Sequence, residues 1–245
     1  MGQSGELYNS SEVPDSHPIA RSHCVGVVIP ARNEAEEIGA VLAGLGTTVE
    51  GVPLVALVVD DGSLDRTADI ARGHGARVIG HVINLGKGAA LKTGCEALIA
   101  SGCDVLVLMD ADGQHQPRDL PSMVRPILNR QAELVLARRR FGHRMPLTMG
   151  LGNWGLSNLF TLMFGAIVSD TQCGLRAFTA DTYRLLEWVA NDYAVETEML
   201  VRAARARVRI CEVDIETIYH DAYKGTTVAD GLRILANMIR WRVGI

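Results

Sequence analysis

Residues 105–116 read VLVLMDADGQHQ, an apolar run that ends in two carboxylates separated by one alanine. The five apolar residues at 105–109 are typical of a strand that is buried on both faces. Asp110 and Asp112 would repel each other at the end of such a strand, so a group from outside the chain is expected to neutralise them. Alternate residues of an extended chain point to the same side, so both carboxylates can reach one centre.

Other short apolar runs precede and follow this strand, and amphipathic stretches lie between them. Strands are expected near residues 25–30, 54–59, 76–79, 104–109 and 133–137. Strands that alternate with helices predict an α/β fold with a mostly parallel sheet covered by helices on both faces. The second half is less regular, with a helix expected near residues 195–206 and a strand near 211–215.

Local signals mark where several of these helices begin. Asn33 and Glu36 form a capping-box-like pair before a helix that runs to about Leu45. Asp65 is placed to cap the next helix, and Pro117 suits the first turn of a later one.

Polar residues gather in the loops that follow the first, second and fourth predicted strands. Ligands of open α/β sheets bind beyond the carboxyl ends of the strands, so these loops are expected to converge on one site. The loop residues are Arg32, Asn33 and Glu34, then Asp60 and Asp61, then Asp110, Asp112 and Gln114.

The composition excludes some classes of function. The chain has 245 residues, 48% of them hydrophobic, which is ample for one domain with a proper core. A net charge of −4 and a pI of 6.0 argue against non-specific nucleic-acid binding, which needs a basic surface. Any phosphate-binding site must therefore be local.

The cysteines predict neither a disulfide framework nor a zinc site. Their number is odd, their spacing is wide, and no C-x-x-C occurs; they are Cys24, Cys95, Cys103, Cys173 and Cys211. A reducing cytosol fits this pattern. The first residues are polar without an apolar core, which excludes a secretory signal and indicates a loose tail over residues 1–22.

Residues 145–169 carry no charge and are long enough in principle to cross a bilayer. Asn153, Ser157 and several glycines interrupt the segment, so we expect a helix pair that is either buried or lies in a membrane interface. Near the carboxyl end, an amphipathic helix is expected with an apolar face and with arginines that can meet anionic headgroups. The apolar residues are Leu232, Leu235, Met238 and Ile239, and the arginines are Arg233, Arg240 and Arg242.

A hard divalent cation suits the two aspartates. Mg²⁺ or Mn²⁺ usually takes one or two carboxylates and completes its shell with water and a substrate diphosphate. Lys87, between two glycines before a helix, is expected to contact phosphate. His115 is either a ligand or a surface hydrogen-bonding residue. The spacing excludes an EF-hand loop, a Walker A loop and a G-x-G-x-x-G dinucleotide fingerprint.

Five ordered motifs, VVIPARNEAEEI, VVDDGSLDRTADIA, NLGKGAALKTG, DADGQHQP and SDTQCGLRAF, resemble those of family 2 glycosyltransferases of GT-A fold. Within that family they are most similar to polyprenol-phosphate sugar synthases, such as dolichol-phosphate mannose or glucose synthase. The resemblance covers residues 25–223 and implies a GT-A (Rossmann-like) catalytic domain at residues 23–220. Residues 221–245 would then form an acceptor loop and a C-terminal amphipathic helix.

The resemblance also implies roles for individual residues. A nucleoside pocket would be lined by Pro30, Ala31, Arg32, Glu34 and Asp61, and Ala111 would also belong to the donor-binding site. Lys87 would meet the diphosphate, and Asp110 with Asp112 would bind the metal, helped by Gln114. Arg32 stands where many relatives carry an aromatic residue. For the acceptor phosphate the candidates are one of Arg138, Arg139 and Arg140, together with Arg176.

The implied reaction is the inverting transfer of a hexose from GDP-mannose, UDP-glucose or another nucleotide sugar to a polyprenol phosphate. The lipid phosphate is already an anion, so a dedicated base is not required, and Asp170 is the first candidate for an orienting residue or base, before Glu196 and Glu198. Attachment is expected to be peripheral, on the cytoplasmic face of the membrane. Two alternatives are a family 2 enzyme acting on a soluble or polysaccharide hydroxyl and a regulator that binds nucleotide sugars without catalysis.

Overall fold

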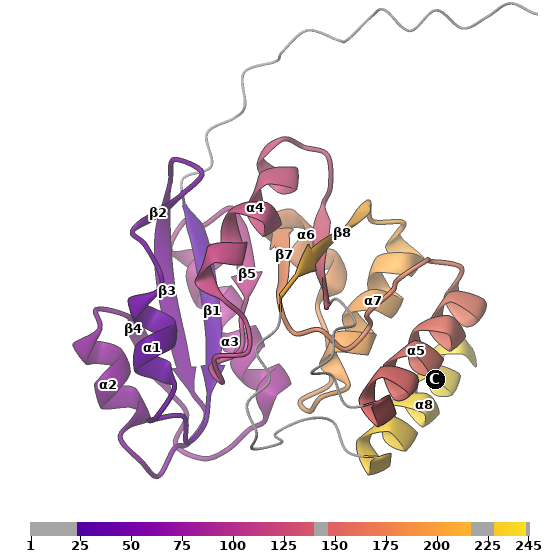
Figure 1. The fold of residues 1–245 in the computed structure, drawn as a ribbon, viewed down its shortest axis with the longest axis horizontal. Helices are drawn as coiled ribbons and strands as arrows, with labels where there is room; N and C mark the ends of the chain where they lie inside the picture. Colours follow the sequence, from indigo (N-terminus) through magenta and orange to yellow (C-terminus); the bar gives the residue numbers. More distant parts are fainter. Residues whose placement is uncertain (1–23, 140–146, 217–227, 244–245) are drawn as a thin grey trace, which may run out of the picture.

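The computed structural model describes residues 24–139, 147–216 and 228–243 (Figure 1). Three expectations fall outside this part of the chain: the polar tail at residues 1–22, the acceptor loop, for which residues 219–227 were expected, and Arg140. The fold below is that of the described segments.

One eight-stranded sheet forms the centre of the described fold, with the order β2-β3-β1-β5-β7-β6-β8 and with β4 paired to β3. The six strands expected from the sequence are all present, and β2 and β7 are additional. The strands are β1 (Val25–Ala31), β2 (Thr48–Val49), β3 (Val52–Asp60), β4 (Arg77–Gly80), β5 (Val105–Leu108), β6 (Leu134–Arg139), β7 (Arg176–Thr179) and β8 (Ile210–Ile215).

The amino-terminal half of the sheet is parallel except for the short β2, which runs antiparallel to β3, and the other half is mixed. β1 pairs in parallel with β3 and β5, and β3 with β4, as the alternation of strands and helices predicts. β7 runs antiparallel between β5 and β6, and β8 pairs in parallel with β6. The carboxyl ends of β1, β3 and β5 therefore reach the same edge, which places the loops that follow them together.

Helices cover both faces of the sheet. The α-helices are α1 (Ile38–Ala43), α2 (Thr67–Gly73), α3 (Lys87–Ala100), α4 (Leu120–Leu128), α5 (Leu147–Phe164), α6 (Ala180–Leu186), α7 (Val195–Ala206) and α8 (Val228–Val243), and a 3₁₀ turn η1 spans Pro117–Asp119. The apolar sides of α1, α2 and α4 share one core cluster, and those of α3, α6 and α7 share the other. In Figure 1, α5 and α8 lie together at the end of the molecule opposite α1 and α2.

The alternation of side chains along β5 explains why this strand is apolar throughout. Leu106 and Leu108 enter the core cluster under α3, whereas Val105, Val107 and Met109 enter the cluster under α4. Each side chain is at most 3% exposed, so both faces of the strand are buried. Burial of five such side chains contributes about 1.5–3 kcal/mol each to folding, before the loss of conformational entropy is counted.

The uncharged segment forms a single helix, α5, rather than the expected helix pair. It packs against α8, which buries Ile234 and Met238 in the same core cluster. Met238 therefore belongs to the docked face of α8, whereas Ile239 is 52% exposed; the side chain of Leu232 lies outside what the structure describes. Among the helices described, none combines the length and apolarity needed to cross a bilayer.

The predicted capping box at Asn33 does not form. Asn33 has a positive φ of 54°, and its side-chain oxygen accepts a hydrogen bond from the backbone N–H of Leu64. Helix α1 starts later, at Ile38, without a side-chain cap. An asparagine tolerates this left-handed conformation and here ties the loop after β1 to the loop after β3.

The prediction of no disulfide is wrong. Cys24 and Cys103 are bonded across 79 residues, while Cys95, Cys173 and Cys211 are free. Cys24 directly precedes β1 and Cys103 lies two residues before β5, and these strands are parallel neighbours, so their starts lie side by side. Sequence spacing could not reveal this pairing, and the cysteines no longer support the expectation of a reducing compartment.

We expect reduction of this disulfide to lower the free energy of unfolding by about 2–4 kcal/mol, because the open chain gains entropy when a long loop is released. Urea denaturation with and without dithiothreitol measures the change. The Cys24→Ser/Cys103→Ser variant is the control, and its stability should not respond to reductant. Equal stability of the wild-type protein under both conditions would contradict the expectation.

Candidate active site

Lys87 and two carboxylates form a partly buried cluster where α3 and α7 begin, beside the carboxyl end of β5. The ammonium of Lys87 lies 2.7 Å from Asp110 Oδ1 and 2.8 Å from Glu196 Oε1. Burial favours the neutral amine, but the charges of Asp110 and Glu196 outweigh it and raise the pKa of Lys87. Burial would likewise raise the pKa of Asp110, yet Lys87 and then His115 hold it well below its ordinary value. Both groups are therefore charged at neutral pH.

Two glycines make this arrangement possible. Gly86 precedes Lys87 with a φ of 98°, a conformation that residues with a side chain rarely adopt. Gly174 lies against the carboxylate of Asp110, where a Cβ atom would collide with it. The backbone around Lys87 is also tied to the segment before α7, because Gly88 N–H donates to the carbonyl of Asn191 at 2.9 Å.

Asp112 is the second carboxylate at this edge. Its Oδ1 accepts a hydrogen bond from the backbone N–H of Gln114 at 3.0 Å. Burial, followed by the nearby negative charge of Asp110, raises the pKa of Asp112. Ala111 between them is 3% exposed and packs into the core under α4. The charge of Asp110 thus acts on Asp112, and the convergence of the two carboxylates on one metal stays a prediction.

The donor set suits a divalent cation that is shared with a substrate. Two carboxylates with an unfavourable mutual charge are what Mg²⁺ or Mn²⁺ neutralises, with water and phosphate oxygens in the remaining positions. In the described part of the chain no group of three or more His, Cys, Asp or Glu residues forms a closed metal cage. His115 is 5% exposed, with Nε2 3.7 Å from Asp110 Oδ2, so it lies behind the carboxylate rather than at the surface.

Asp61 organises the loop that leads to Lys87. Its carboxylate accepts hydrogen bonds from the backbone N–H groups of Leu85 and Gly86, each at 2.8 Å, and lies 2.8 Å from His81 Nδ1. Burial would raise the pKa of Asp61, but His81 and these N–H groups outweigh it and lower the pKa. Asp61, which was predicted to line the nucleoside pocket, is thus an anion that connects the end of β3 with the start of α3.

The remaining residues predicted for a nucleoside pocket lie at the end of β1 and in the loop after it. Ala31 is buried, Pro30 and Glu34 are half-buried, and Arg32 is exposed. The backbone N–H of Glu34 donates to Thr67 Oγ1 at 2.9 Å, which holds this loop against α2. The Asn33–Leu64 hydrogen bond joins the same two loops, so the edge of the candidate pocket has a defined backbone.

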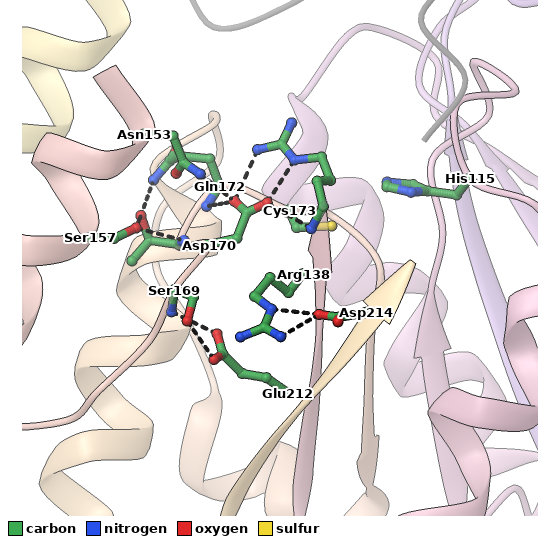
Figure 2. A network of polar contacts seen from close by, with 12 residues as sticks. His115, Arg138, Asn153, Ser157, Ser169, Asp170, Gln172, Cys173, Glu212 and Asp214 are labelled. Atoms are coloured by element: carbon green, nitrogen blue, oxygen red, sulfur yellow. Dashed lines mark hydrogen bonds and ion pairs between the residues drawn. The ribbon is translucent and has the colours of Figure 1, made fainter. Parts of the chain in front are cut away.

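Asp170 and Arg139 form a buried ion pair between β6 and the loop before β7. Arg139 Nε and Nη2 donate to the two Asp170 oxygens at 2.7 and 2.9 Å. Asp170 Oδ1 also accepts from Asn153 Nδ2 at 2.9 Å and from the backbone N–H of Gln172 at 3.2 Å (Figure 2). Burial would raise the pKa of Asp170, but Arg139 lowers it below its ordinary value. Of the two roles considered for Asp170, this environment favours orienting Arg139 over acting as a base.

Arg138 and Arg139 point to different partners although they are adjacent on β6. Arg138 pairs with Asp214 of β8 at 2.5 Å, and both side chains are partly exposed. Figure 2 shows this pair next to Glu212, whose carboxylate accepts hydrogen bonds from Ser169. The alternation along the strand thus separates a peripheral arginine from the buried Arg139, and between these two it favours Arg139 as the candidate for the acceptor phosphate.

Arg176 is fully buried at 0% exposure. Its guanidinium donates to the backbone carbonyls of Thr171, Cys173 and Glu196 at 2.9, 3.1 and 2.6 Å. This arrangement contradicts the expectation that Arg176 meets an acceptor phosphate, because its donors are used inside the protein. Arg176 instead joins the loop before β7 to the start of α7, where it fixes the position of Glu196.

Three contributors to the site were not predicted from the sequence. His81 bridges Asp61 and Thr93 Oγ1, at 2.8 and 3.1 Å. Asn153 projects from α5 toward Asp170, and Trp188 Nε1 donates to the carbonyl of Gly88 at 2.8 Å. The sequence could have indicated Asn153, since it is a polar residue in an uncharged segment. It could not indicate His81 and Trp188, because these residues lie far in sequence from their partners.

Comparisons with known proteins identify this sheet, with Lys87 and the paired carboxylates beside its parallel half, as that of a glycosyltransferase of the GT-A fold. The chain belongs to the glycosyl transferase family 2, whose family model matches residues 26–185. The resemblance stated from the five motifs is thereby confirmed.

Two curated relatives cover most of this chain. One is the UDP-N-acetylglucosamine–dolichyl-phosphate N-acetylglucosaminyltransferase of Methanococcus voltae, 33% identical over 89% of this chain and 96% of the relative. The other is the undecaprenyl-phosphate mannosyltransferase of Micrococcus luteus, 33% identical over 87% of this chain and 92% of the relative. Both names specify a polyprenyl phosphate.

Among solved structures, glucosyl-3-phosphoglycerate synthase of Mycobacterium tuberculosis is similar to the whole fold. Its complex with Mn²⁺, UDP-glucose and phosphoglyceric acid matches with a TM-score of 0.72 and 25% identity, over 91% of this chain and 80% of that one. The likeness confirms the predicted fold class.

Proposed function

We propose that this glycosyltransferase moves a hexose from a nucleotide-diphosphate sugar to a polyprenyl phosphate at the surface of a membrane, with inversion of the anomeric centre. The observation that carries the proposal is the partly buried cluster of Lys87, Asp110 and Asp112 at the carboxyl edge of the sheet. The acceptor class is supported by the two relatives that are named for dolichyl and undecaprenyl phosphate.

The donor would lie across the ends of β1, β3 and β5. Pro30, Ala31, Arg32, Glu34 and Asp61 would contact the nucleoside, with Ala111 beside the diphosphate. Lys87 is the cation that meets the phosphates, because a lysine ammonium binds phosphate as a point charge. Selectivity for guanine or uracil would depend on the loop at Arg32, which is exposed.

Asp110 and Asp112 would hold Mg²⁺ or Mn²⁺, with Gln114 near the same position. When bound, the metal would stabilise the negative charge that develops on the leaving diphosphate oxygen. The raised pKa of Asp112 supports this assignment, since two carboxylates in a buried setting stay ionised together only if a cation compensates them.

The acceptor phosphate would approach Arg139. Asp170 holds the guanidinium through two hydrogen bonds, so the group is oriented before a ligand arrives. A phosphate monoester oxygen is already nucleophilic, and it can attack the sugar without losing a proton to a protein base. One in-line displacement gives a β-linked sugar phosphate from an α-linked donor.

Transfer of label into lipid tests this function directly. The purified protein with Mn²⁺, radiolabelled GDP-mannose, UDP-glucose or UDP-N-acetylglucosamine, and a polyprenyl phosphate should give a butanol-extractable product with one of the donors. Omitting the lipid should abolish the product. Label transferred only to water-soluble acceptors would favour the alternative of a hydroxyl-directed enzyme, and binding of nucleotide sugar without turnover would favour a regulator.

Exposed apolar side chains on α5 and α8 support the membrane part of the proposal. Trp154 and Leu162 of α5 are 62% and 83% exposed, and Ile239 of α8 is 52% exposed, with Arg240 and Arg242 nearby on α8. An apolar surface flanked by arginines is suited to a bilayer interface that contains anionic lipids.

We expect Leu162→Glu to weaken binding to vesicles of mixed neutral and anionic lipid, by about 1 kcal/mol or more, because it places a charge where the surface meets acyl chains. Vesicle co-sedimentation measures the loss. Leu64→Glu is the matched control: Leu64 is 94% exposed but lies in the loop between β3 and α2, at the other end of the molecule (Figure 1). Equal binding of the two variants would contradict an interfacial role for α5.

A further inference from the structure

Lys87 is shared between two carboxylates that come from different parts of the fold. Asp110 follows β5, and Glu196 lies in the first turn of α7. The ammonium also lies 5.8 Å from the ring centroid of Tyr193, and the lysine side chain is 18% exposed. Its charge is therefore compensated within the protein, without any ligand.

Two cations would bind the carboxylate of Asp110. It is the closer partner of Lys87, and it is also a ligand of the proposed metal site. A divalent cation on Asp110 would repel an ammonium 2.7 Å away from the same carboxylate, so the two cations compete for it. A lysine with no other partner would then leave for solvent, taking a phosphate-binding charge away from the site.

We propose that Glu196 is a positioning residue that retains Lys87 in the site when a divalent cation takes Asp110. Lys87 would act as a built-in counter-ion for Asp110 in the free enzyme and would turn to the diphosphate after the exchange. This inference rests on the proposed metal site at Asp110 and Asp112, and it assigns to Glu196 a role other than that of base.

The surroundings of Glu196 suit such a fixed anchor. The residue is 5% exposed, and Arg176 holds its backbone carbonyl at 2.6 Å. Within the described segments its Oε2 has no hydrogen-bond partner, whereas its Oε1 lies 2.8 Å from the ammonium of Lys87. Separating this buried carboxylate from the ammonium would remove the contact from both groups, so Glu196 and Lys87 hold each other in place.

Neighbouring contacts keep the two ends of this bond in register. Glu198, two residues after Glu196 in α7, accepts hydrogen bonds from the backbone N–H groups of Val189 and Ala190. That segment continues to Asn191, which accepts from Gly88 N–H beside Lys87. The start of α7 and the start of α3 are thus both hydrogen-bonded to the backbone of residues 189–191, through contacts that do not depend on a metal.

Amine labelling of Lys87, followed by mass spectrometry, tests the proposal with Mn²⁺ alone as the probe. In the wild-type protein, Lys87 should label slowly with and without Mn²⁺. In Glu196→Gln it should label slowly without Mn²⁺, because Asp110 still holds it. Addition of Mn²⁺ to this variant should accelerate labelling about tenfold or more, since the released ammonium regains the reactivity of a solvated lysine.

Lys92 and Glu187 provide a matched control. They form a lysine–glutamate pair at 3.5 Å on the surface, with side chains 41% and 54% exposed. Glu187→Gln should leave the labelling of Lys87 slow under both conditions, and Lys92 serves as the internal reference for reagent activity. Glu196→Asp retains the charge at a shorter reach, so it should give an intermediate acceleration and replaces Glu196→Gln if that variant does not fold.

The outcomes separate this inference from the proposed metal site. Binding of Mn²⁺ to wild type, followed by electron paramagnetic resonance, tests the metal site alone, and absence of binding would overturn the assignment on which the inference rests. If Mn²⁺ binds but Lys87 becomes reactive in wild type, or stays protected in Glu196→Gln, then Glu196 does not retain the lysine and the proposal is wrong.

Discussion

Replacing Asp112 with asparagine should lower kcat by about 10²–10³-fold, the effect typical of losing one group that stabilises charge on the leaving oxygen. Asparagine has nearly the same shape but cannot supply the second negative charge that a shared divalent cation requires. The KM for the nucleotide sugar should rise less, because Lys87 and the nucleoside pocket are unchanged. Transfer of labelled sugar to lipid, at saturating donor and Mn²⁺, measures both constants.

The same substitution should leave the free energy of unfolding unchanged or raise it. In the folded protein, burial and the charge of Asp110 raise the pKa of Asp112, so ionising this carboxylate opposes folding. Removing the charge relieves that cost, and urea denaturation in the presence of a chelator should show a variant at least as stable as wild type. A loss of activity together with retained stability would separate a functional role from a structural one.

Asp181→Asn is the control for this experiment. The side chain of Asp181 is 90% exposed and pairs with Arg184 on the surface of α6. Its removal should change neither turnover nor Mn²⁺ dependence. Unchanged turnover in Asp112→Asn, with the fold intact, would contradict the metal assignment and with it the chemistry proposed for the leaving diphosphate.

The apolar runs of the sequence predicted most of the sheet because both faces of these strands are buried. β1 and β5 read as continuous apolar segments, and α7 occupies the residues expected for it. β7 escaped prediction because its first residue is Arg176, a charged side chain that is fully buried among carbonyl groups. A hydrophobic pattern does not identify a strand that begins with such a residue.

The loops that form the candidate site were predictable from the sequence, but the contacts between side chains from distant segments were not. Strand order brings the ends of β1, β3 and β5 to one edge, so Asp61 and Asp110 were placed correctly by topology alone. The partner of Lys87 on α7, and the Cys24–Cys103 bond, join segments that are distant in sequence. Such contacts depend on how helices pack on the finished sheet, and no local periodicity encodes them.

The register of the arginines illustrates the same limit. Three consecutive arginines follow one strand, and the sequence left open which of them faces the site. The structure distinguishes Arg138 from Arg139, because successive side chains of β6 point to opposite faces. Arg138 pairs with Asp214, whereas Arg139 pairs with Asp170. Arg139 pairs with Asp170, which is 3% exposed. Arg139 therefore contributes to the stability of the fold and is also the candidate for binding the acceptor phosphate.

Replacing Asp170 with asparagine is accordingly expected to lower the free energy of unfolding by about 3–5 kcal/mol, because it leaves the guanidinium of Arg139 buried without its counter-charge. The Arg139 and Asp170 side chains are 11% and 3% exposed. Asp214→Asn is the matched control: its partner Arg138 is adjacent on the same strand, but that pair is more exposed and should contribute no more than about 1 kcal/mol. Urea denaturation of the two variants measures the difference.

The effect should also depend on pH, with a sign that follows from the lowered pKa of Asp170. A carboxyl group whose pKa is depressed by folding stabilises the protein above its ordinary value of about 4, and this stabilisation is lost as the pH falls through the folded value. The gap between wild type and Asp170→Asn should therefore be full near pH 7 and should shrink in acid below about pH 4. A variant that keeps wild-type stability at neutral pH would contradict the contribution expected from the Arg139–Asp170 pair.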